Sequence, residues 1–512
     1  MASRLAWPAV VTVAACGLFA AFLAQSARAT YVTSDGASIA LQAWDMLHGN
    51  LLLRGWAVAD VSFYTIDLPE FALVEAIRGF GPFAVHIAAA LTYTALVLLA
   101  ALLAKGRATG REGVTRALIA AGIMLAPELG NPSGVLLLSP DHVATGVPLL
   151  LTWIIVDRGA STRWAPVVAG LLLAWTAVGD LLAEVVGALP LAAVCGLRII
   201  QARVARRPLR DSWYELSLLT AAVCAVAVAW AGTHLIAAEG GWTGAPLHTS
   251  PAGPGALGHN AALTGHGILQ LYGAAFGVQP GVLAGVFAAV HLIGLGLAAL
   301  GLCLALRRYL SADLVVQVLV AAIAVNLAAY LLSREAQDIT NTREIAAVLA
   351  FGAALAGRML GKHLLQPRRA VVAAAVLAGY TGMLVFDAVQ PPVPVATADL
   401  ASWLTAHDLT RGLAGYWQAA SVTLYSANRV QVRAIADGPA GLTGETWWEG
   451  KKSWYTAGNQ ANFVISTGSA AQWRDQKLIR QLADMAGRPS AIYQVGDFTV
   501  AVWHENLMTK LR

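Results

Sequence analysis

A single carboxylate, Asp35, stands just beyond the first long apolar run of the chain. A helix-like segment begins directly after it, so this carboxylate lies where a membrane-bound reactant would arrive. A carboxylate in that place could act as a general base toward an attacking hydroxyl. The alternative is structural, since Ser34 can cap a helix and an acid in the first turn is favoured by the helix dipole. The residues alone leave both interpretations open.

Asp141 and His142 form a second candidate site at the start of a later apolar run. They are predicted at the same membrane level as Asp35, and the three side chains could share one hard divalent cation, Mg or Mn, if the intervening loop folds back. Ser139 as a cap followed by Pro140 is also an ordinary helix start, with Asp141 as a dipole partner.

Arg343 and Arg334 lie in a short, charge-rich segment, residues 333–344. A cation in the first turn of a helix opposes the dipole, and Arg343 is also on the predicted outer side, where basic residues are rare. A lipid phosphate would stabilise Arg343, with Arg334 as second ligand, because guanidinium groups bind phosphate bidentately. Pairing of Arg343 with Glu335 or Asp338 is an equal alternative.

Other polar residues receive structural interpretations beside functional ones. Asn341 and Glu344 match a capping box, which would account for Glu344. Asp180 and Glu184 stand at the break between two apolar runs. Ionisable groups so close to the membrane interior are functional by default, and the tip of an interfacial hairpin would also place them there.

Trp447 and Trp448 are adjacent in the carboxy-terminal part of the chain. Their rings could stack on sugars and bind an acceptor, although core packing explains most tryptophans of a small domain equally well. If the pair lies on a strand, one ring must point largely outward.

The elements that position these residues are those of a membrane protein. Of the 512 residues 57% are hydrophobic and 12% are charged, against roughly a quarter charged in a soluble protein. We therefore expect an all-α polytopic membrane bundle. About eleven apolar runs reach or approach spanning length, at residues 7–25, 83–104, 114–130, 142–157, 164–180, 182–200, 213–238, 280–306, 312–332, 345–361 and 369–387.

Lysine and arginine concentrate in alternate loops, which are therefore predicted to be cytoplasmic. This pattern places the amino terminus inside and everything after residue 387 outside, and it does not resemble a nucleic-acid binding surface. The first helix is expected to stay uncleaved, because cleavage near Ala29 would release Asp35 from its helix. The basic loops are residues 105–116, 158–163, 198–210, 307–308 and 358–369.

Two domains are predicted: a transmembrane domain over residues 1–390, with a long first outer loop at 26–82, and a small mixed α/β extracytoplasmic domain over 391–512. The first loop should contain interfacial helices at 34–48 and 71–78. A Gly-, Pro- and His-rich outer loop at 239–266 is expected to be mobile. In the carboxy-terminal domain, periodicity predicts helices at 397–409 and 471–486 and strands at 421–425, 429–435, 462–466, 491–493 and 498–503.

This organisation resembles the GT-C superfamily of membrane glycosyltransferases, in the manner of the protein O-mannosyltransferase and aminoarabinose transferase families. Three runs look like those of actinobacterial membrane proteins assigned there: 34–50 (SDGASIALQAWDMLHGN), 62–70 (SFYTIDLPE) and 343–352 (REIAAVLAFG). The resemblance implies a polyprenyl-phosphate sugar donor, inverting transfer on the outer face and often a divalent metal. It also implies that Asp35 is the base or a metal ligand. Many members have two acids there, where this chain has Ser34 and Asp35.

We therefore expect a glycosyltransferase that moves a hexosyl or pentosyl group from a polyprenyl phosphate to a cell-wall glycan, glycolipid or protein. A non-catalytic cell-envelope assembly or glycan-binding protein is one alternative, favoured by the missing second acid. A lipid or solute transporter is another, and it is disfavoured because the predicted spans carry almost no charge at mid-depth.

Overall fold

The structure is a computed structural model that describes residues 2–128, 130–138, 141–160, 162–245, 250–277, 281–438, 441–456 and 458–511. The chain folds as two compact units. The helical unit comprises Met1–Thr30, Ala89–Thr233 and His248–Pro391. The mixed unit comprises Tyr31–Ala88, His234–Leu247 and Pro392–Arg512.

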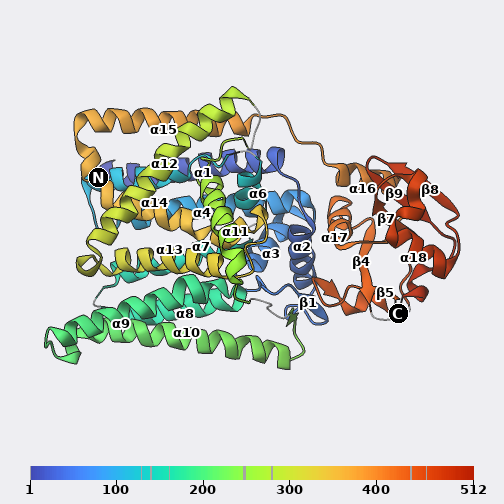
Figure 1. The fold of residues 1–512 in the computed structure, drawn as a ribbon, viewed down its shortest axis with the longest axis horizontal. Helices are drawn as coiled ribbons and strands as arrows, with labels where there is room; N and C mark the ends of the chain where they lie inside the picture. Colours follow the sequence, from blue (N-terminus) through green and yellow to red (C-terminus); the bar gives the residue numbers. More distant parts are fainter. Residues whose placement is uncertain are drawn as a thin grey trace. The chain divides into compact units, whose positions relative to one another are not determined.

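Each predicted spanning run contains a helix in the structure, although the run at 114–130 is helical only to Met124. Helices satisfy their own backbone hydrogen bonds, which is required in lipid. Seven helical segments of the described residues are long and apolar enough to cross a membrane, and α8 and α14 are shorter apolar helices. Most long helices of the helical unit lie nearly parallel in Figure 1, and α12 crosses them obliquely. The helices are α1 (Ala2–Ala29), α4 (Pro82–Lys105), α5 (Gly110–Met124), α7 (Asp141–Arg158), α8 (Trp164–Gly179), α9 (Leu189–Val204), α10 (Trp213–Ala238), α12 (Val282–Arg307), α13 (Leu314–Leu332), α14 (Ala347–Leu360) and α15 (Pro367–Ala388).

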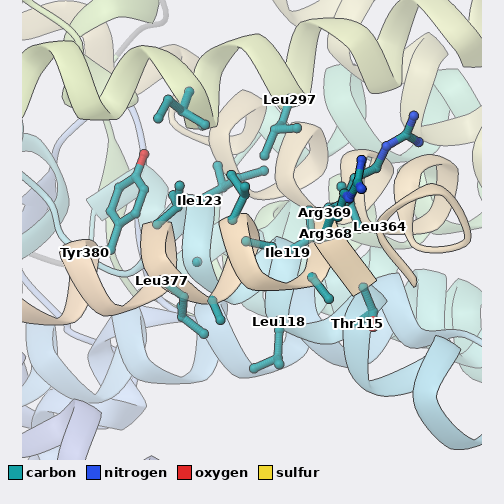
Figure 2. Close-up of a pocket in the computed structure, with 18 residues that line it drawn as sticks. Thr115, Leu118, Ile119, Ile123, Leu297, Leu364, Arg368, Arg369, Leu377 and Tyr380 are labelled. Carbon is teal, nitrogen blue, oxygen red and sulfur yellow. The ribbon is translucent and has the colours of Figure 1, made fainter. Parts of the chain in front are cut away.

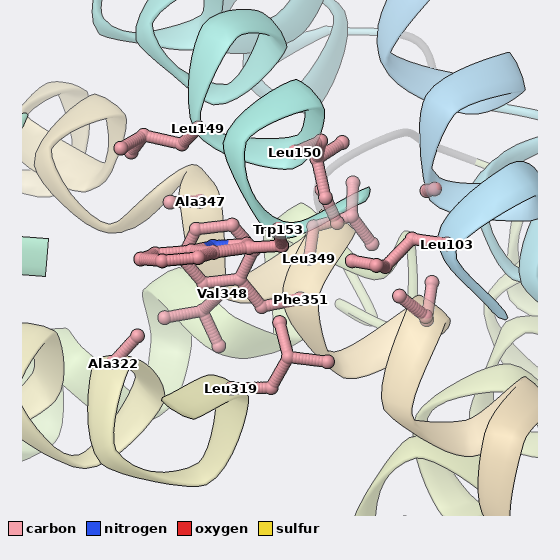
Figure 3. Close-up of a cluster of buried hydrophobic side chains, with 14 of the residues drawn as sticks. Leu103, Leu149, Leu150, Trp153, Leu319, Ala322, Ala347, Val348, Leu349 and Phe351 are labelled. Atoms are coloured by element: carbon pink, nitrogen blue, oxygen red, sulfur yellow. The ribbon is translucent and has the colours of Figure 1, made fainter. Parts of the chain in front are cut away.

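The core of the helical unit lies where α7, α13 and α14 meet. Trp153 of α7 is fully buried there beside Leu319 of α13 and Phe351 of α14 (Figure 3). Close approach of the helices depends on small residues. A side chain at Gly357 of α14 would place its Cβ 2.4 Å from the carbonyl oxygen of Arg116, so only glycine fits at this crossing.

The prediction of a mobile loop at 239–266 is wrong for the second half of this segment. Helix α11 (Leu257–Leu271) forms there and packs against α13 and the short 3-10 helix η5 (Ile339–Ile345). Asn260 is buried and donates hydrogen bonds of 2.9 Å to the carbonyls of Leu331 and Ser333. The glycines and histidines of this stretch suggested a loop, whereas its tertiary hydrogen bonds and apolar spacing favour a helix.

The carboxy-terminal part of the mixed unit is an α/β fold, as predicted. Its six-stranded sheet has the order β5-β4-β3-β7-β9-β8, in which β3 pairs parallel with β4 and β7 and the other pairs are antiparallel. The elements are α16 (Ala396–Ala406), β3 (Arg411–Ala414), α17 (Tyr416–Tyr425), β4 (Gln431–Gly438), β5 (Gly441–Gly444), β7 (Phe463–Thr467), α18 (Lys477–Ala486), β8 (Ala491–Val495) and β9 (Phe498–Val502).

The strand predicted at 421–425 is wrong, because these residues form the second half of α17. Val422, Thr423 and Tyr425 are residue types that favour strands, and this local preference led to the prediction. However, β3 and β4 are parallel neighbours, and parallel strands that follow each other need a crossover connection, usually a helix. The sheet topology therefore overrides the local preference.

The first loop packs with the carboxy-terminal segment inside the mixed unit, although the sequence groups it with the spanning helices. Helix α2 (Ser34–Leu47) packs on α3 (Asp67–Arg78) and on α17. Strand β1 (Trp56–Val58) lies between β2 (Thr243–Gly244) and β6 (Gly450–Lys451) in a three-stranded sheet.

Asp45 of α2 reinforces this packing. Its carboxylate binds Lys451 at 2.8 Å and accepts a 2.7 Å hydrogen bond from the indole of Trp56. Burial acts to raise the pKa of Asp45, but the hydrogen bonds from Lys451 and Trp56 outweigh it and lower the pKa below the usual value. The folded mixed unit therefore holds Asp45 as a carboxylate.

Candidate active site

Asp35 lies in the first turn of α2, as predicted. Its Oδ1 accepts a 2.5 Å hydrogen bond from the phenol of Tyr416, the first residue of α17, and the same hydroxyl contacts Oε2 of Glu449. The Ser34 side chain does not cap the helix; it donates to the carbonyl oxygen of Tyr416 at 2.6 Å. The carboxy-terminal segment thus supplies a hydrogen-bond donor to Asp35.

The shared hydroxyl of Tyr416 constrains the proton arrangement at this point. Burial is the main cause of a raised pKa of Tyr416, and the charges of Glu449 and Asp35 add to it, so the phenol stays protonated. A phenol has one proton and can donate it to one carboxylate at a time. Asp35 and Glu449 therefore share one neutral donor, which serves one of them at a time.

Glu449 is held in an unusual backbone conformation. It precedes β6, is buried, and has a φ of +44°, in the left-handed region that non-glycine residues rarely adopt. Such strain persists only where the surrounding structure requires it, and it is common at functional sites. The contact with Tyr416 supplies a reason for holding Glu449 in this conformation.

Trp447 and Trp448 directly precede Glu449 and lie in a loop, not on a strand. Trp447 is 47% exposed and Trp448 is half-buried. Strand geometry therefore does not decide where the two rings point, although one of them does face outward. Binding of an acceptor by this pair stays a prediction.

The second candidate site lies in the helical unit and is centred on His142. Its Nδ1 is 2.9 Å from Oδ2 of Asp180 and its Nε2 is 3.1 Å from Oε1 of Glu344. Asp180 also accepts hydrogen bonds from the Thr145 hydroxyl and from the backbone amide of Leu182, the latter at 2.8 Å. Carboxylates at both ring nitrogens require a donor at each, which is the imidazolium form. His142 is therefore the centre of a buried ionic cluster.

Arg343 joins this cluster from η5. Its Nη1 is 3.1 Å from Oδ2 of Asp141, its Nε is 4.0 Å from Glu344, and its side chain is 38% exposed. Asp141 has a φ of +40°, a second strained carboxylate position. Arg343 is thus a partly exposed cation that two carboxylates hold in the cluster.

Arg334 lies in the same segment but is not joined to the cluster by a side-chain hydrogen bond or ion pair among the described residues. Its side chain is exposed, and its backbone amide donates to Ser250 at 3.0 Å. Of the two proposed pairing partners of Arg343, Asp338 caps η5 through Thr340, and its pKa is lowered first by those hydrogen bonds and only weakly by Arg343.

Four residues of the two candidate sites are not predicted as site residues from the sequence: Asp180, Glu344, Tyr416 and Glu449. The capping box expected for Glu344 does not form, because its carboxylate binds His142. Asp180 was recognised as an ionisable group near the membrane, which is a usable signal. Nothing in the local sequence marks Tyr416 or Glu449. The predicted cap and first position of α7, Ser139 and Pro140, lie outside the described residues.

The residues predicted to share a metal do not fit that role in this arrangement. Both nitrogens of His142 are engaged by carboxylates, and Asp141 is engaged by Arg343. No group of three metal-binding side chains occurs among the described residues. Asp35 belongs to the mixed unit, whereas Asp141 and His142 belong to the helical unit. A shared cation stays a prediction, and no chemical step below depends on it.

Comparison with known proteins defines the class of fold. No protein-family model and no curated protein sequence matches the chain. Solved structures do match it, and they include an aminoarabinose transferase and an oligosaccharyltransferase, both of the GT-C superfamily. The chain therefore has the GT-C fold, as its sequence predicts, with a small strand-containing domain at the carboxy-terminal end.

Three of the matching structures come from two proteins. The apo crystal structure of ArnT, an aminoarabinose transferase, from Cupriavidus metallidurans matches with a TM-score of 0.60 at 12% identity, over 100% of this chain and 99% of that one. The crystal structure of ArnT bound to undecaprenyl phosphate matches with a TM-score of 0.56 at 10% identity, over 97% of this chain and 98% of that one. The Archaeoglobus fulgidus oligosaccharyltransferase, tethered to an acceptor peptide, matches with a TM-score of 0.50 at 13% identity, over 96% of this chain and 74% of that one.

Proposed function

We propose that this chain is an inverting membrane glycosyltransferase that moves a sugar from a polyprenyl phosphate to a cell-envelope acceptor. The observation that carries the proposal is Asp35, a carboxylate at the start of α2 oriented by Tyr416, in a chain with the GT-C fold. The crystal structure of ArnT bound to undecaprenyl phosphate supports a polyprenyl phosphate as the donor class.

In the proposed reaction, the acceptor hydroxyl transfers its proton to Asp35 as its oxygen attacks the anomeric carbon. The bond between that carbon and the phosphate oxygen breaks, and the polyprenyl phosphate leaves with the bonding electrons. Attack from the face opposite the phosphate inverts the anomeric configuration. Tyr416 acts as a positioning residue, because its phenol donates a hydrogen bond to Oδ1 of Asp35.

Arg343 is proposed to bind the donor phosphate, with Arg334 as a second cation. Charge develops on the phosphate as it leaves, and a preorganised guanidinium stabilises that charge. Asp141 and Glu344 hold Arg343 in place through contacts of 3.1 Å and 4.0 Å. A donor phosphate would contact this side chain, which is 38% exposed.

The orientation is proposed from the distribution of lysine and arginine. Basic residues in alternate loops place the amino terminus in the cytoplasm and Asp35 on the outer side. A cell-wall glycan, glycolipid or protein would then be the acceptor, and the exposed ring of Trp447 offers a stacking surface for a sugar.

The test is transfer of radiolabelled sugar from a panel of polyprenyl-phosphate sugars by protein in lipid vesicles, with wild type, Asp35→Asn and Asp60→Asn compared. Asp60 is a matched control, since it lies in the same loop and its carboxylate accepts a 3.0 Å hydrogen bond from the neighbouring Val61 amide. Turnover lost in Asp35→Asn and kept in Asp60→Asn supports the proposal. EDTA in a parallel reaction tests the Mg or Mn hypothesis.

No turnover with any donor would favour a glycan-binding or assembly role. In that case, binding of cell-wall glycan should require Trp447 and not Asp35. Equal turnover in wild type and Asp35→Asn would show that Asp35 is not the base.

A further inference from the structure

A cavity of about 510 Å³ runs along the helical unit between α5, α12 and α15, separate from the candidate active site (Figure 2). Its walls are apolar and include Ile119 and Ile123 of α5, Leu297 of α12 and Leu377 of α15. An apolar groove on spanning helices is a surface that lipid chains cover. Its two ends show which lipid would bind.

The ends differ in charge. Arg368 and Arg369, in the first turn of α15, form one end, and Tyr380 forms the other (Figure 2). Both arginines are exposed. Arg369 donates a 3.1 Å hydrogen bond to the carbonyl of His363, and Arg368 has no side-chain acceptor in the described part of the chain. The groove therefore pairs an apolar wall with two cations at a single end.

The length of the groove matches one leaflet. Tyr380 follows Arg369 by 11 positions (380 − 369), which corresponds to a rise of about 17 Å along an α-helix. Half of a hydrocarbon core is about 15 Å thick. The groove thus begins at the membrane surface and ends near the midplane, the depth that one acyl chain of a phospholipid occupies.

We propose that this groove is a binding site for an anionic phospholipid, with its phosphate between Arg368 and Arg369 and one acyl chain along α15. The donor is not the occupant, because the two phosphate sites are on opposite membrane faces. Arg343 precedes α14 and Arg368 follows it, and α14 is a shorter apolar helix that lies within the span predicted from sequence at 345–361. By the basic-loop pattern the lipid comes from the cytoplasmic leaflet, where anionic headgroups attract basic residues.

The test is native mass spectrometry of the full chain released from bilayers of equimolar phosphatidylglycerol and phosphatidylcholine. Wild type should retain phosphatidylglycerol preferentially. Each basic residue near an anionic surface contributes roughly a fivefold preference, so Arg368→Gln/Arg369→Gln should lower the preference by more than about tenfold. Arg206→Gln/Arg207→Gln is the matched control, because it removes the same charge from another exposed basic loop.

A second variant, Ala373→Trp, fills the groove without changing charge and should reduce retention of the lipid while both arginines remain. Inorganic phosphate added as competitor should not displace the lipid. The proposal is overturned if the control pair lowers retention equally, if both lipids are retained equally, if Ala373→Trp has no effect, or if inorganic phosphate displaces the lipid. The assay measures no transfer, so it is independent of the proposed enzymatic activity.

Discussion

The phenol of Tyr416 binds the carboxylate of Asp35 across 381 positions of sequence, at 2.5 Å. The donor comes from the carboxy-terminal α/β domain and the acceptor from the first loop, and both belong to the mixed unit. The proposed base is therefore oriented by the domain that the sequence alone would treat as separate.

Removal of this donor should slow transfer without loss of the fold. We expect Tyr416→Phe to lower kcat by about tenfold to a hundredfold, because a hydrogen bond to a charged group contributes roughly 1.5–3 kcal/mol. Steady-state kinetics in vesicles would measure it. The donor KM should stay near that of wild type, and Tyr493→Phe, an exposed tyrosine on β8, is the control. An unchanged kcat in Tyr416→Phe would show that Tyr416 does not position the base.

Loss of the Arg343 guanidinium should weaken use of the donor. Arg343→Gln is expected to lower kcat/KM at least tenfold, because charge-assisted hydrogen bonds to phosphate are lost. Arg343→Lys should recover only part of this, since an ammonium cannot bind phosphate bidentately. Arg308→Gln, in an exposed basic loop, serves as control. Equal kcat/KM values for Arg343→Gln and Arg308→Gln would exclude a role in phosphate binding.

Removal of His142 should destabilise the helical unit. The Asp180 side chain has no exposed surface, and its charge would remain buried without its cation, which costs about 3 kcal/mol or more. A large fall in Tm of the detergent-solubilised His142→Gln variant is therefore expected, whereas the exposed His259→Gln control should melt like wild type. If Asp180 is the reason, adding Asp180→Asn to His142→Gln should recover part of the loss.

Glu75 should make stability depend on pH. This side chain of α3 is 1% exposed, and burial raises its pKa to about 9. The folded state then binds one more proton than the unfolded state between its ordinary value of 4.5 and about 9, so stability falls as pH rises, by roughly 1.4 kcal/mol per pH unit.

Glu75→Gln should abolish that dependence and raise Tm most at about pH 9, as thermal melts between pH 5 and pH 9 would show. Glu70→Gln on the same helix is the control for charge removal. If Tm changed with pH in the same way for wild type and Glu75→Gln across this range, Glu75 would not be the cause of the pH dependence.

The spanning helices could be predicted from sequence because each depends on a local signal, an apolar run of membrane length. The position of Asp35 in the first turn of α2 follows from equally local preferences. The strand wrongly predicted at 421–425 shows the limit, since the parallel pairing of β3 and β4 decides the conformation there. Local preference does not report which strands are neighbours.

The partners of the candidate residues could not be predicted, for the same reason. His142 and Asp180 are 38 positions apart, and Arg343 and Asp141 are 202 apart. The periodicity of apolar residues in a sequence does not indicate pairs that are so far apart. Glu344 shows the effect most clearly, because its local pattern fits a capping box and its actual partner is His142 on another helix.

The packing of α2 against α17 constrains how such a chain could be recombined. A chimaera that exchanged only the segment after residue 391 would bring a foreign residue to the place of Tyr416 and leave α2 with a mismatched surface. Recombination would have to exchange residues 31–88 together with that segment. The proposed base and the residue that orients it would then be inherited together, and a change in either segment would favour compensating changes in the other.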